Sequence, residues 1–265
     1  MGTVGRPRAD PRTSTAEPQE EILEAAADLF ATVGYTAGTA SAATATKAEK
    51  AQLTAVAAPA YTAPTRTLKE GMKGADVKAL QQRLAALKYY PGAADGTFGA
   101  NTLEAVWAFQ EVNGLSVDGV VGPATGRALV HPRAWKPRDP RQNGTRVEVN
   151  LTLRVLALYI NHRVALISHV SSGGGYYYCS NGGCSYAITP TGNFRTTVYM
   201  PGWVTVPLGE MYNPVFFIST VFAIHGDTDV PVNPVSHGCI RIPMDIAAFF
   251  HTMVKTPGTE VFVYK

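Results

Sequence analysis

The segment Ile224-His225-Gly226, followed after nine intervening residues by Ser236-His237-Gly238-Cys239-Ile240-Arg241, places a cysteine beside two glycine-flanked histidines in a cysteine-poor chain. A cysteine attacks acyl carbons as its thiolate, so it needs an imidazole to take the proton and amides to hold the developing oxyanion. We therefore predict Cys239 as a nucleophile, with His225 and His237 as candidate bases. The alternative for a lone cysteine is a small buried hydrophobic residue.

This arrangement resembles the signature of the L,D-transpeptidase (YkuD-type) catalytic domain. The resemblance extends upstream to Thr189-Pro190-Thr191-Gly192-Asn193-Phe194, which is similar to the Thr-Pro-x-Gly-x-Phe segment of that family, so it covers about residues 146–265. The chain departs from the usual pattern in two ways: the gap after His225 is shorter, and Arg241 stands where an Asn is usual. Arginine also occurs there in the family and marks a subgroup.

The resemblance implies a role for each residue of the motif. Cys239 would be the nucleophile and His225 the base, with the carbonyl of Gly226 orienting the other ring nitrogen; the alternative for His225 is a satisfied core histidine. We expect the amides of His237, Gly238 and Cys239 to form the oxyanion hole, because a glycine before the nucleophile allows close approach of substrate. The other residues expected to contact the oxyanion or the substrate are Ser236, His237 and Arg241. His237 would position substrate or the loop if it moves no proton. Arg241 would bind a substrate carboxylate, and the alternative is a surface ion pair.

The implied reaction is acyl transfer between peptidoglycan stems in cell-wall biogenesis, which maintains cell shape. Cys239 would attack the third residue of a tetrapeptide, release D-alanine and pass the acyl group to the amine of a second stem, giving a 3→3 cross-link. The expected partners are stem peptides and glycan, with no cofactor and no metal, outside the cytoplasm, and carbapenems should acylate Cys239. The alternatives are an L,D-carboxypeptidase using water, a non-catalytic peptidoglycan-binding protein, and a zinc hydrolase with His225, His237 and Cys239 as ligands.

The other two cysteines, Cys179 and Cys184, enclose a short glycine-rich turn. Four intervening residues bring two α-carbons within bridging reach, so we expect a disulfide that leaves Cys239 as the free thiol. Two free surface cysteines are the alternative. A zinc pair is disfavoured because no second pair of ligands follows at the right spacing.

Residues 1–40 contain Gly5-Arg6-Pro7-Arg8 and an amphipathic pattern from Glu20 to Tyr35, which resemble the first helix of TetR-type repressors. No recognition helix follows, so we expect no nucleic-acid partner, in keeping with a net charge of only +3. No signal peptide and no membrane span are visible, and we interpret this start as a fused or misassigned fragment. Residues 41–67, rich in Ala, Thr, Ser and Pro, predict a disordered linker.

Residues 68–131 predict a compact three-helix unit, in which Val77, Leu80, Leu84 and Leu87 repeat at helical spacing. An internal repeat, Asp95-Gly96 and Asp118-Gly119, provides turns before the later helices. This unit resembles a peptidoglycan-binding type 1 domain, and we expect its aspartates to form turns and Trp107 to belong to the core.

Residues 132–145 predict a proline-containing tether, and residues 146–265 the catalytic domain. Alternating apolar residues from Val147, a run from Val155 to Ile160, a turn at Asn161-His162 and a run from Val164 to Val170 predict antiparallel strands. A helix is expected only near 244–254. The predicted fold class is α+β multidomain: a small three-helix module followed by a β-rich, sandwich-like domain.

Overall fold

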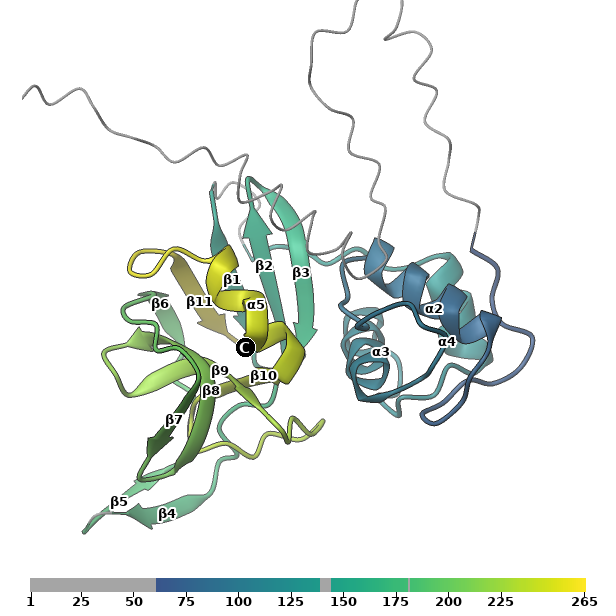
Figure 1. Cartoon of the computed structure of the whole chain (residues 1–265). Helices are drawn as coiled ribbons and strands as arrows, with labels where there is room; N and C mark the ends of the chain where they lie inside the picture. The colour runs from purple at the N-terminus through teal and green to yellow at the C-terminus, as the bar shows by residue number, and fades with distance from the viewer. Residues whose placement is uncertain (1–60, 139–143, 181) are drawn as a thin grey trace, which may run out of the picture.

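The computed structural model of the chain describes residues 61–138, 144–180 and 182–265. It has a helical part and a strand-rich part packed side by side, which confirms the predicted fold class (Figure 1). The predicted TetR-like helix in residues 1–40 and most of the predicted linker lie outside the described residues. No helix in the described part of the chain is long and apolar enough to cross a membrane.

The helical part contains the three predicted helices. They are α2 (Ala75–Ala86), α3 (Ala100–Asn113) and α4 (Pro123–Val130). Helix α3 ends at Gly114, whose φ of 67° is the left-handed conformation that glycine adopts without strain, and α4 begins with Pro123, whose fixed φ suits a first turn. Their apolar faces meet in one core that includes Val77, Leu80, Leu84, Val106, Phe109 and Leu129.

Two buried glutamines tie the repeated Asp-Gly turns to the helices. Gln81 on α2 donates to Asp95 Oδ1 at 3.0 Å and accepts from Gly96 N at 2.9 Å. Gln110 on α3 repeats this pattern, donating to the Asp118 carboxylate and accepting from the amide of Gly119. The aspartates thus serve as turn residues, as predicted, and each glutamine satisfies polar groups that the turn would otherwise bury unpaired.

The strand-rich part consists of two main sheets and a small hairpin. The first sheet has the strand order β3-β2-β1-β11-β6, the second β10-β9-β8-β7, and the hairpin is β4-β5. The strands of the first sheet are β1 (Arg146–Asn150), β2 (Val155–Ile160), β3 (Arg163–His169), β6 (Gly192–Arg195) and β11 (Glu260–Tyr264). The others are β4 (Tyr177–Ser180), β5 (Gly183–Tyr186), β7 (Trp203–Val206), β8 (Gly209–Ile218), β9 (Phe222–Asp227) and β10 (Ile240–Pro243).

The main core lies between the two sheets and helix α5 (Met244–Met253), the helix expected near 244–254. Val149 and Leu158 of the first sheet pack with Ile224 of β9 and Phe250 of α5, all with essentially no exposure. Because side chains alternate along a strand, the neighbours of Ile224 on β9 point away from this core. That outer face of the second sheet carries the candidate site.

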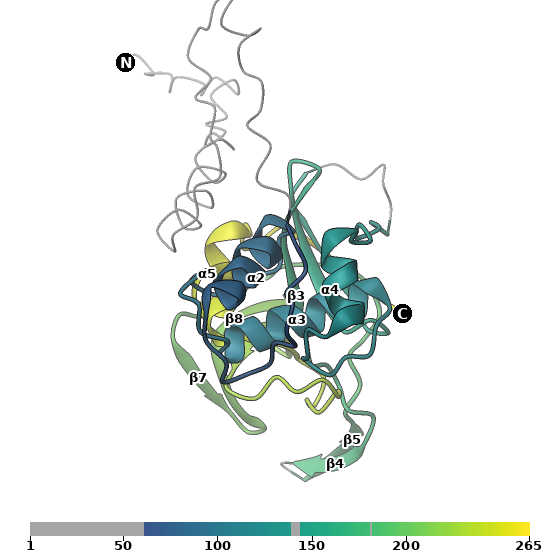
Figure 2. The ribbon, with the colours of Figure 1, turned by 90° about the vertical axis from the view of Figure 1, so that its right-hand side faces the viewer.

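The helical part is docked on the first sheet rather than loosely tethered. Val155 and Ile167 contribute to the helical core, and the amide of Ile167 donates to Lys88 O at 2.8 Å. Helix α3 lies along β3 (Figure 2). The two parts therefore share buried surface, and the position of one constrains the other.

The segments predicted as flexible connections are partly packed. Within 61–67, predicted as the end of the linker, the Tyr61 ring lies under the Arg83 guanidinium at 5.7 Å and Arg66 pairs with Asp76 at 2.6 Å. In the predicted tether, Arg138 N donates to a Glu148 carboxylate oxygen at 2.9 Å. Aromatic and charged side chains find partners here, so these described portions belong to the folded body.

Candidate active site

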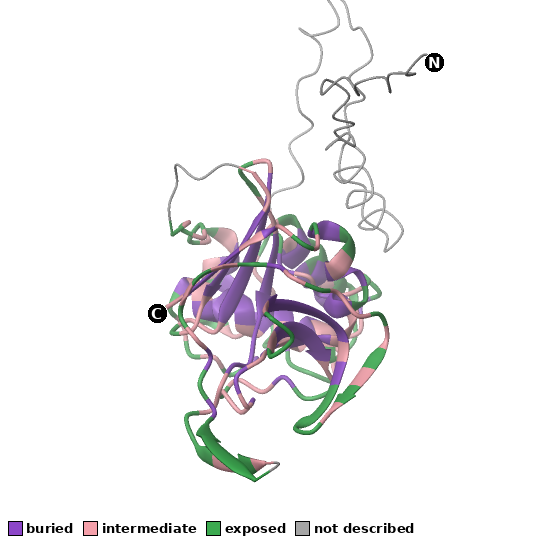
Figure 3. Cartoon of the chain, turned by 90° about the vertical axis from the view of Figure 1, so that its left-hand side faces the viewer, coloured by how far each residue is buried: buried purple, intermediate pink, exposed green. Residues whose placement is uncertain are grey.

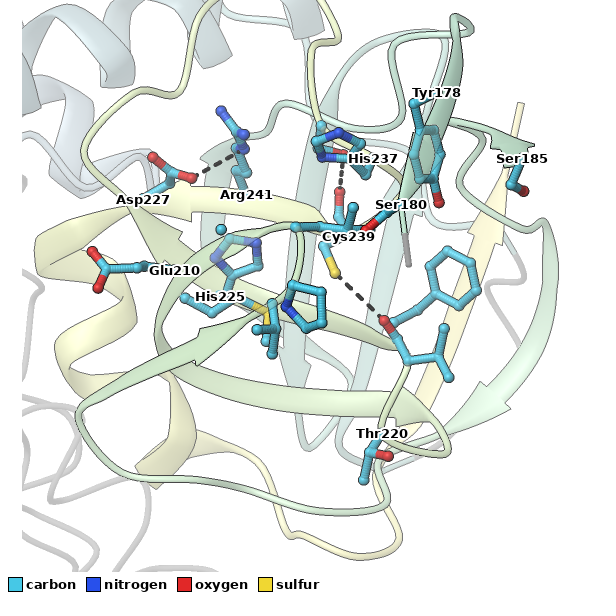
Figure 4. A pocket seen from close by; sticks show the side chains of 18 of the residues that line it. Tyr178, Ser180, Ser185, Glu210, Thr220, His225, Asp227, His237, Cys239 and Arg241 are labelled. Carbon is cyan, nitrogen blue, oxygen red and sulfur yellow. Dashed lines mark hydrogen bonds and ion pairs between the residues drawn. The ribbon is translucent and has the colours of Figure 1, made fainter. Parts of the chain in front are cut away.

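The pairing of β9 with β10 brings His225 and Cys239 together. The two strands run parallel with Ile224 opposite Ile240 and His225 opposite Arg241, and Cys239 immediately precedes β10. Since side chains alternate, His225, Cys239 and Arg241 all face away from the core. Figure 4 shows these three side chains on one side of the sheet.

His225 is 3% exposed, and its Nδ1 lies 2.9 Å from the carbonyl oxygen of Gly226. A carbonyl oxygen only accepts, so Nδ1 carries the hydrogen and Nε2 keeps its lone pair. Burial lowers the pKa of His225, although the Gly226 carbonyl and Asp227 oppose this in part. The ring is therefore a neutral imidazole in the tautomer that can accept a proton at Nε2.

Cys239 is the one free thiol among the described residues and is partly exposed. Its Sγ accepts the amide of Ala223 at 3.4 Å and lies 3.8 Å from the carbonyl oxygen of Val221. Burial raises the pKa of the Cys239 thiol, while the Ala223 amide and Arg241 lower it in part. The resting sulfur is therefore protonated, and its hydrogen points toward Val221 rather than His225.

Ser236 fixes the turn that presents Cys239. Its hydroxyl donates to Cys239 O at 2.6 Å and accepts from Gly238 N at 3.0 Å. The Gly238 amide, one of the three expected to form an oxyanion hole, is therefore engaged by Ser236. No acceptor within the described residues engages the amides of His237 and Cys239, so these two remain available to a substrate oxygen.

Gly238 has a φ of 140°, which L side chains rarely adopt. A Cβ atom there would lie 2.5 Å from Phe222 Cε1 and 2.9 Å from Ile188 O. The glycine is thus required by a close approach of three chain segments. The glycine was expected to allow close approach of substrate, and in the structure it allows close approach of Phe222 and Ile188.

Thr189 stabilises the same turn through a hydrogen bond to the carbonyl of Gly238. Its hydroxyl donates to Gly238 O at 2.7 Å and accepts from Gly173 N at 2.9 Å. The side chain is 4% exposed. Thr189 therefore links the segment after β3 to the residue preceding Cys239.

Arg241 forms an ion pair with Asp227, with Nε 3.1 Å from Oδ2, and also donates to Asp229 O at 3.2 Å. The ion pair expected as one interpretation of Arg241 is thus present, and its role toward a substrate carboxylate stays a prediction. The side chain is 20% exposed, so the guanidinium still borders the open space beside His225.

His237 is held by aromatic rings rather than by a charge. The Tyr178 and Tyr176 rings meet it edge to face, at centroid distances of 4.7 and 5.6 Å. Tyr178 belongs to β4, whose hairpin with β5 projects from the body of the molecule and is largely exposed (Figure 3). A disulfide joins Cys179 and Cys184 across this hairpin.

The disulfide and the Tyr178–Ser185 pair lie on opposite faces of the hairpin, although Cys184 also contributes to the lining of the cavity. Tyr178 pairs with Ser185 across the strands and Cys179 with Cys184, so the alternation separates these pairs. Tyr178, Ser180 and Ser185 point toward the cavity in Figure 4. The disulfide thus joins the two strands that form this polar wall of the cavity.

A cavity of about 570 Å³ opens over Cys239, between this hairpin and the β7–β8 hairpin. One wall is polar and includes Tyr178 and Ser185, and the other is apolar and includes Val206, Leu208 and Met211. Its size suits a peptide-like ligand. Among the described residues no three His, Cys, Asp or Glu side chains are grouped so that they could hold a metal ion.

Comparison with known proteins agrees with both parts of the fold. Residues 73–129 match the peptidoglycan binding domain family PG_binding_1, and residues 144–263 match the L,D-transpeptidase catalytic domain family YkuD. The crystal structure of an L,D-transpeptidase from Xylanimonas cellulosilytica DSM 15894 is 36% identical with a TM-score of 0.71, covering 76% of this chain and 98% of that one. The chain belongs to the L,D-transpeptidase family.

Curated relatives share shorter stretches with this chain. The N-acetylmuramoyl-L-alanine amidase CwlL of Bacillus licheniformis is 43% identical over 89 residues, 32% of this chain and 24% of the relative. The zinc D-Ala-D-Ala carboxypeptidase of Streptomyces albus G is 48% identical over 64 residues, 22% of this chain and 24% of the relative. The chain thus spans about a quarter of the length of these two relatives.

The sequence did not predict the contacts of three residues of this candidate site. Thr189 lies in the segment that carried the family resemblance, so its presence was signalled but its contact with the Gly238 carbonyl was not. Tyr178 gave only an aromatic run, and Asp227 only a carboxylate two residues after His225. The structure otherwise brings the predicted Cys239, His225, Gly226, Ser236, His237, Gly238 and Arg241 to one edge of the second sheet, with Cys179 and Cys184 in the hairpin beside them.

Proposed function

We propose that this protein forms 3→3 cross-links in peptidoglycan through a thioester on Cys239. The observation that carries the proposal is that a neutral His225, with its Nε2 lone pair free, shares one sheet face with the one free thiol of the described residues, at the base of a peptide-sized cavity. A base next to a nucleophile in a cleft is the arrangement that acyl transfer requires.

The first half-reaction begins when the Cys239 thiol turns from the Val221 carbonyl toward His225. Nε2 of His225 takes the proton as sulfur attacks the carbonyl carbon of the third stem residue. Two amides that have no acceptor among the described residues, those of His237 and Cys239, would hold the oxyanion. The intermediate then collapses: its C–N bond breaks, the imidazolium protonates the departing D-alanine amine, and the thioester remains.

The second half-reaction reverses these roles. The side-chain amine of a second stem attacks the thioester carbon and gives its proton to Nε2 of His225, after which the C–S bond breaks and Cys239 recovers a proton. The energy of the cleaved peptide bond is retained in the thioester, so no nucleotide is needed. The Gly226 carbonyl keeps the imidazole in one tautomer through both halves.

Water in place of the second amine would make the protein an L,D-carboxypeptidase. The apolar wall formed by Val206, Leu208 and Met211 favours the transferase, because an apolar surface excludes water while a long diamino acid side chain can lie along it. Peptidoglycan as substrate also implies action outside the cytoplasm, with the helical module holding the enzyme on its polymer.

Intact-protein mass spectrometry with a disaccharide-tetrapeptide tests the mechanism. The wild-type chain should gain the mass of the acyl tripeptide unit and release cross-linked dimer, and Cys239→Ala should do neither. His225→Gln should lower the acylation rate by about 10²- to 10⁴-fold, the usual contribution of a general base. His131→Gln, which changes an exposed histidine after α4, is the matched control.

Two outcomes would count against the proposal. Product formation by Cys239→Ala would show that sulfur is not the nucleophile. Release of tripeptide without dimer, at acceptor concentrations up to the millimolar range, would assign the carboxypeptidase instead. A carbapenem should give a Cys239-dependent adduct in the same assay, which checks the thiol independently of the acceptor.

A further inference from the structure

A histidine that carries no motif lies fully buried where the helical module meets the catalytic domain. His169, the last residue of β3, is 1% exposed. Its Nδ1 lies 3.2 Å from Glu111 Oε2 on α3, and its Nε2 lies 3.1 Å from the carbonyl oxygen of Pro231. The ring edge also meets the Trp107 ring at 5.5 Å. One side chain thus connects the module to the segment that links His225 with Cys239.

The partners of His169 dictate where its protons are. The Pro231 carbonyl only accepts, so Nε2 carries a hydrogen. At Nδ1 the ring either donates to the Glu111 carboxylate or accepts from the protonated acid, and in both forms one proton lies between Glu111 and Nδ1. Arg154 Nε reaches the other carboxyl oxygen of Glu111 at 3.0 Å. Every polar atom of this buried group is then paired, as a low-dielectric interface requires.

The contact with Pro231 begins a longer set of hydrogen bonds between the chain after β3 and the catalytic loop. Ser171 Oγ donates to Asn233 O at 3.0 Å and accepts from Val235 N at 3.2 Å. The Ser236 amide donates to Ser172 O at 3.0 Å. His169 is the first residue of this series and the only one of these that is also held by the module.

We propose that His169 is a positioning residue: through Glu111 and Pro231 it makes the peptidoglycan-binding module part of the framework that holds the Cys239 loop. The module then serves catalysis by fixing the loop as well as by retaining polymer. The inference rests on the proposed function only in that Cys239 must react for its effect on rate to be seen.

The geometry suggests a set of substitutions that separates positioning from plain stabilisation. His169→Ala and Glu111→Ala remove the connection. Glu111→Gln retains it, because the amide can accept from Arg154 and donate to Nδ1 while Nε2–H still meets Pro231. Ile167→Ala is the matched control: it weakens the same interface by loss of packing, two residues from His169, and leaves the polar connection intact.

Hydrogen exchange of the full chain, followed by mass spectrometry, is the first measurement. His169→Ala and Glu111→Ala should raise hydrogen exchange in the peptide covering 228–241. Ile167→Ala should leave hydrogen exchange in this peptide unchanged, even when it lowers the melting temperature by the same amount. The acylation rate should fall about 10- to 100-fold in the two former variants, the scale expected for a shift of about 1 Å in a reacting group. Glu111→Gln should recover most of the rate that Glu111→Ala loses, with KM unchanged throughout.

Equal effects of His169→Ala and Ile167→Ala on the loop would overturn the proposal and leave His169 as an interface residue only. Unchanged exchange in 228–241 after His169→Ala would do the same. If the wild-type chain forms no acyl-enzyme, the proposed function fails, and the exchange comparison still decides the positioning role by itself.

Discussion

The Thr189→Val substitution separates the contribution of the Thr189 hydrogen bonds to the turn before Cys239 from the contribution of its packing. The substitution exchanges a hydroxyl for a methyl group of similar shape on a β-branched side chain, so it opens no cavity. It removes the bonds of 2.7 Å to Gly238 O and 2.9 Å from Gly173 N. Each partner left unpaired costs about 1–3 kcal/mol, so the free energy of unfolding should fall by roughly 2–6 kcal/mol.

The assay is urea denaturation followed by fluorescence, with Thr189→Ser as the matched control. Serine keeps the hydroxyl and loses one methyl group, which should cost only about 1 kcal/mol. The two variants should share the same denaturant dependence, because neither changes how much surface unfolding exposes. Acylation of Cys239 should slow about tenfold or more in the valine variant alone, since the Gly238 carbonyl that orients the turn is released.

Equal unfolding free energies for Thr189→Val and Thr189→Ser, within about 0.5 kcal/mol, would refute this reasoning, because the hydroxyl would then contribute nothing measurable. A normal acylation rate in a clearly destabilised valine variant would refute the predicted effect of Thr189 on the reactivity of Cys239. The turn would then be held by Ser236 without help from Thr189.

Three further predictions concern other sites. Burial, together with nearby carboxylates, raises the pKa of Glu104 to about 8, above its unfolded value of 4.5, so stability is lost as pH rises from about 4.5 through 8. Glu104→Gln should therefore be as stable as wild type at pH 4 in thermal melts. At pH 8 its free energy of unfolding should be higher by roughly 1–3 kcal/mol, a value reduced because the group is partly exposed. Replacing Cys179 and Cys184 by serine should loosen the hairpin by about 2 kcal/mol and raise KM several-fold, with kcat and global melting nearly unchanged in a steady-state assay. Gly238→Ala, which forces a Cβ within 2.9 Å of a backbone carbonyl, should abolish acylation in a mass-spectrometric assay while circular dichroism still shows folded protein.

Local patterns were sufficient for most of the secondary structure. The alternation from Val147 and the apolar run from Val155 predicted β1 and β2, and the turn at Asn161-His162 is confirmed, with both residues at positive φ (47° and 66°) as a tight hairpin turn requires. These patterns can be recognised in the sequence because each depends on side chains only a few residues apart. Helix periodicity predicted the three module helices for the same reason.

Contacts between distant residues escaped prediction. His169 meets Glu111 across 58 positions and Pro231 across 62, and neither separation leaves a periodic trace in the sequence. A buried glutamine such as Gln81 also has no signal, because its role is visible only once the turn that it satisfies is folded against the helix. The motif also gave no sign that the Ser236 side chain accepts a hydrogen bond from the Gly238 amide, one of the three amides expected to form an oxyanion hole.

The pKa shifts of His225 and Cys239 give a physical reason for a carbonyl, rather than a carboxylate, beside Nδ1 of the proposed base. Burial disfavours a charged His225 and a charged Cys239 alike, so the proton rests on sulfur until substrate arrives. A carboxylate at Nδ1 would favour the imidazolium and a preformed ion pair. The Gly226 carbonyl instead fixes the tautomer at 2.9 Å without adding a full charge. In the proposed mechanism, charge separation would coincide with the substrate carbonyl entering the turn, where the amides of His237 and Cys239 would offset its cost.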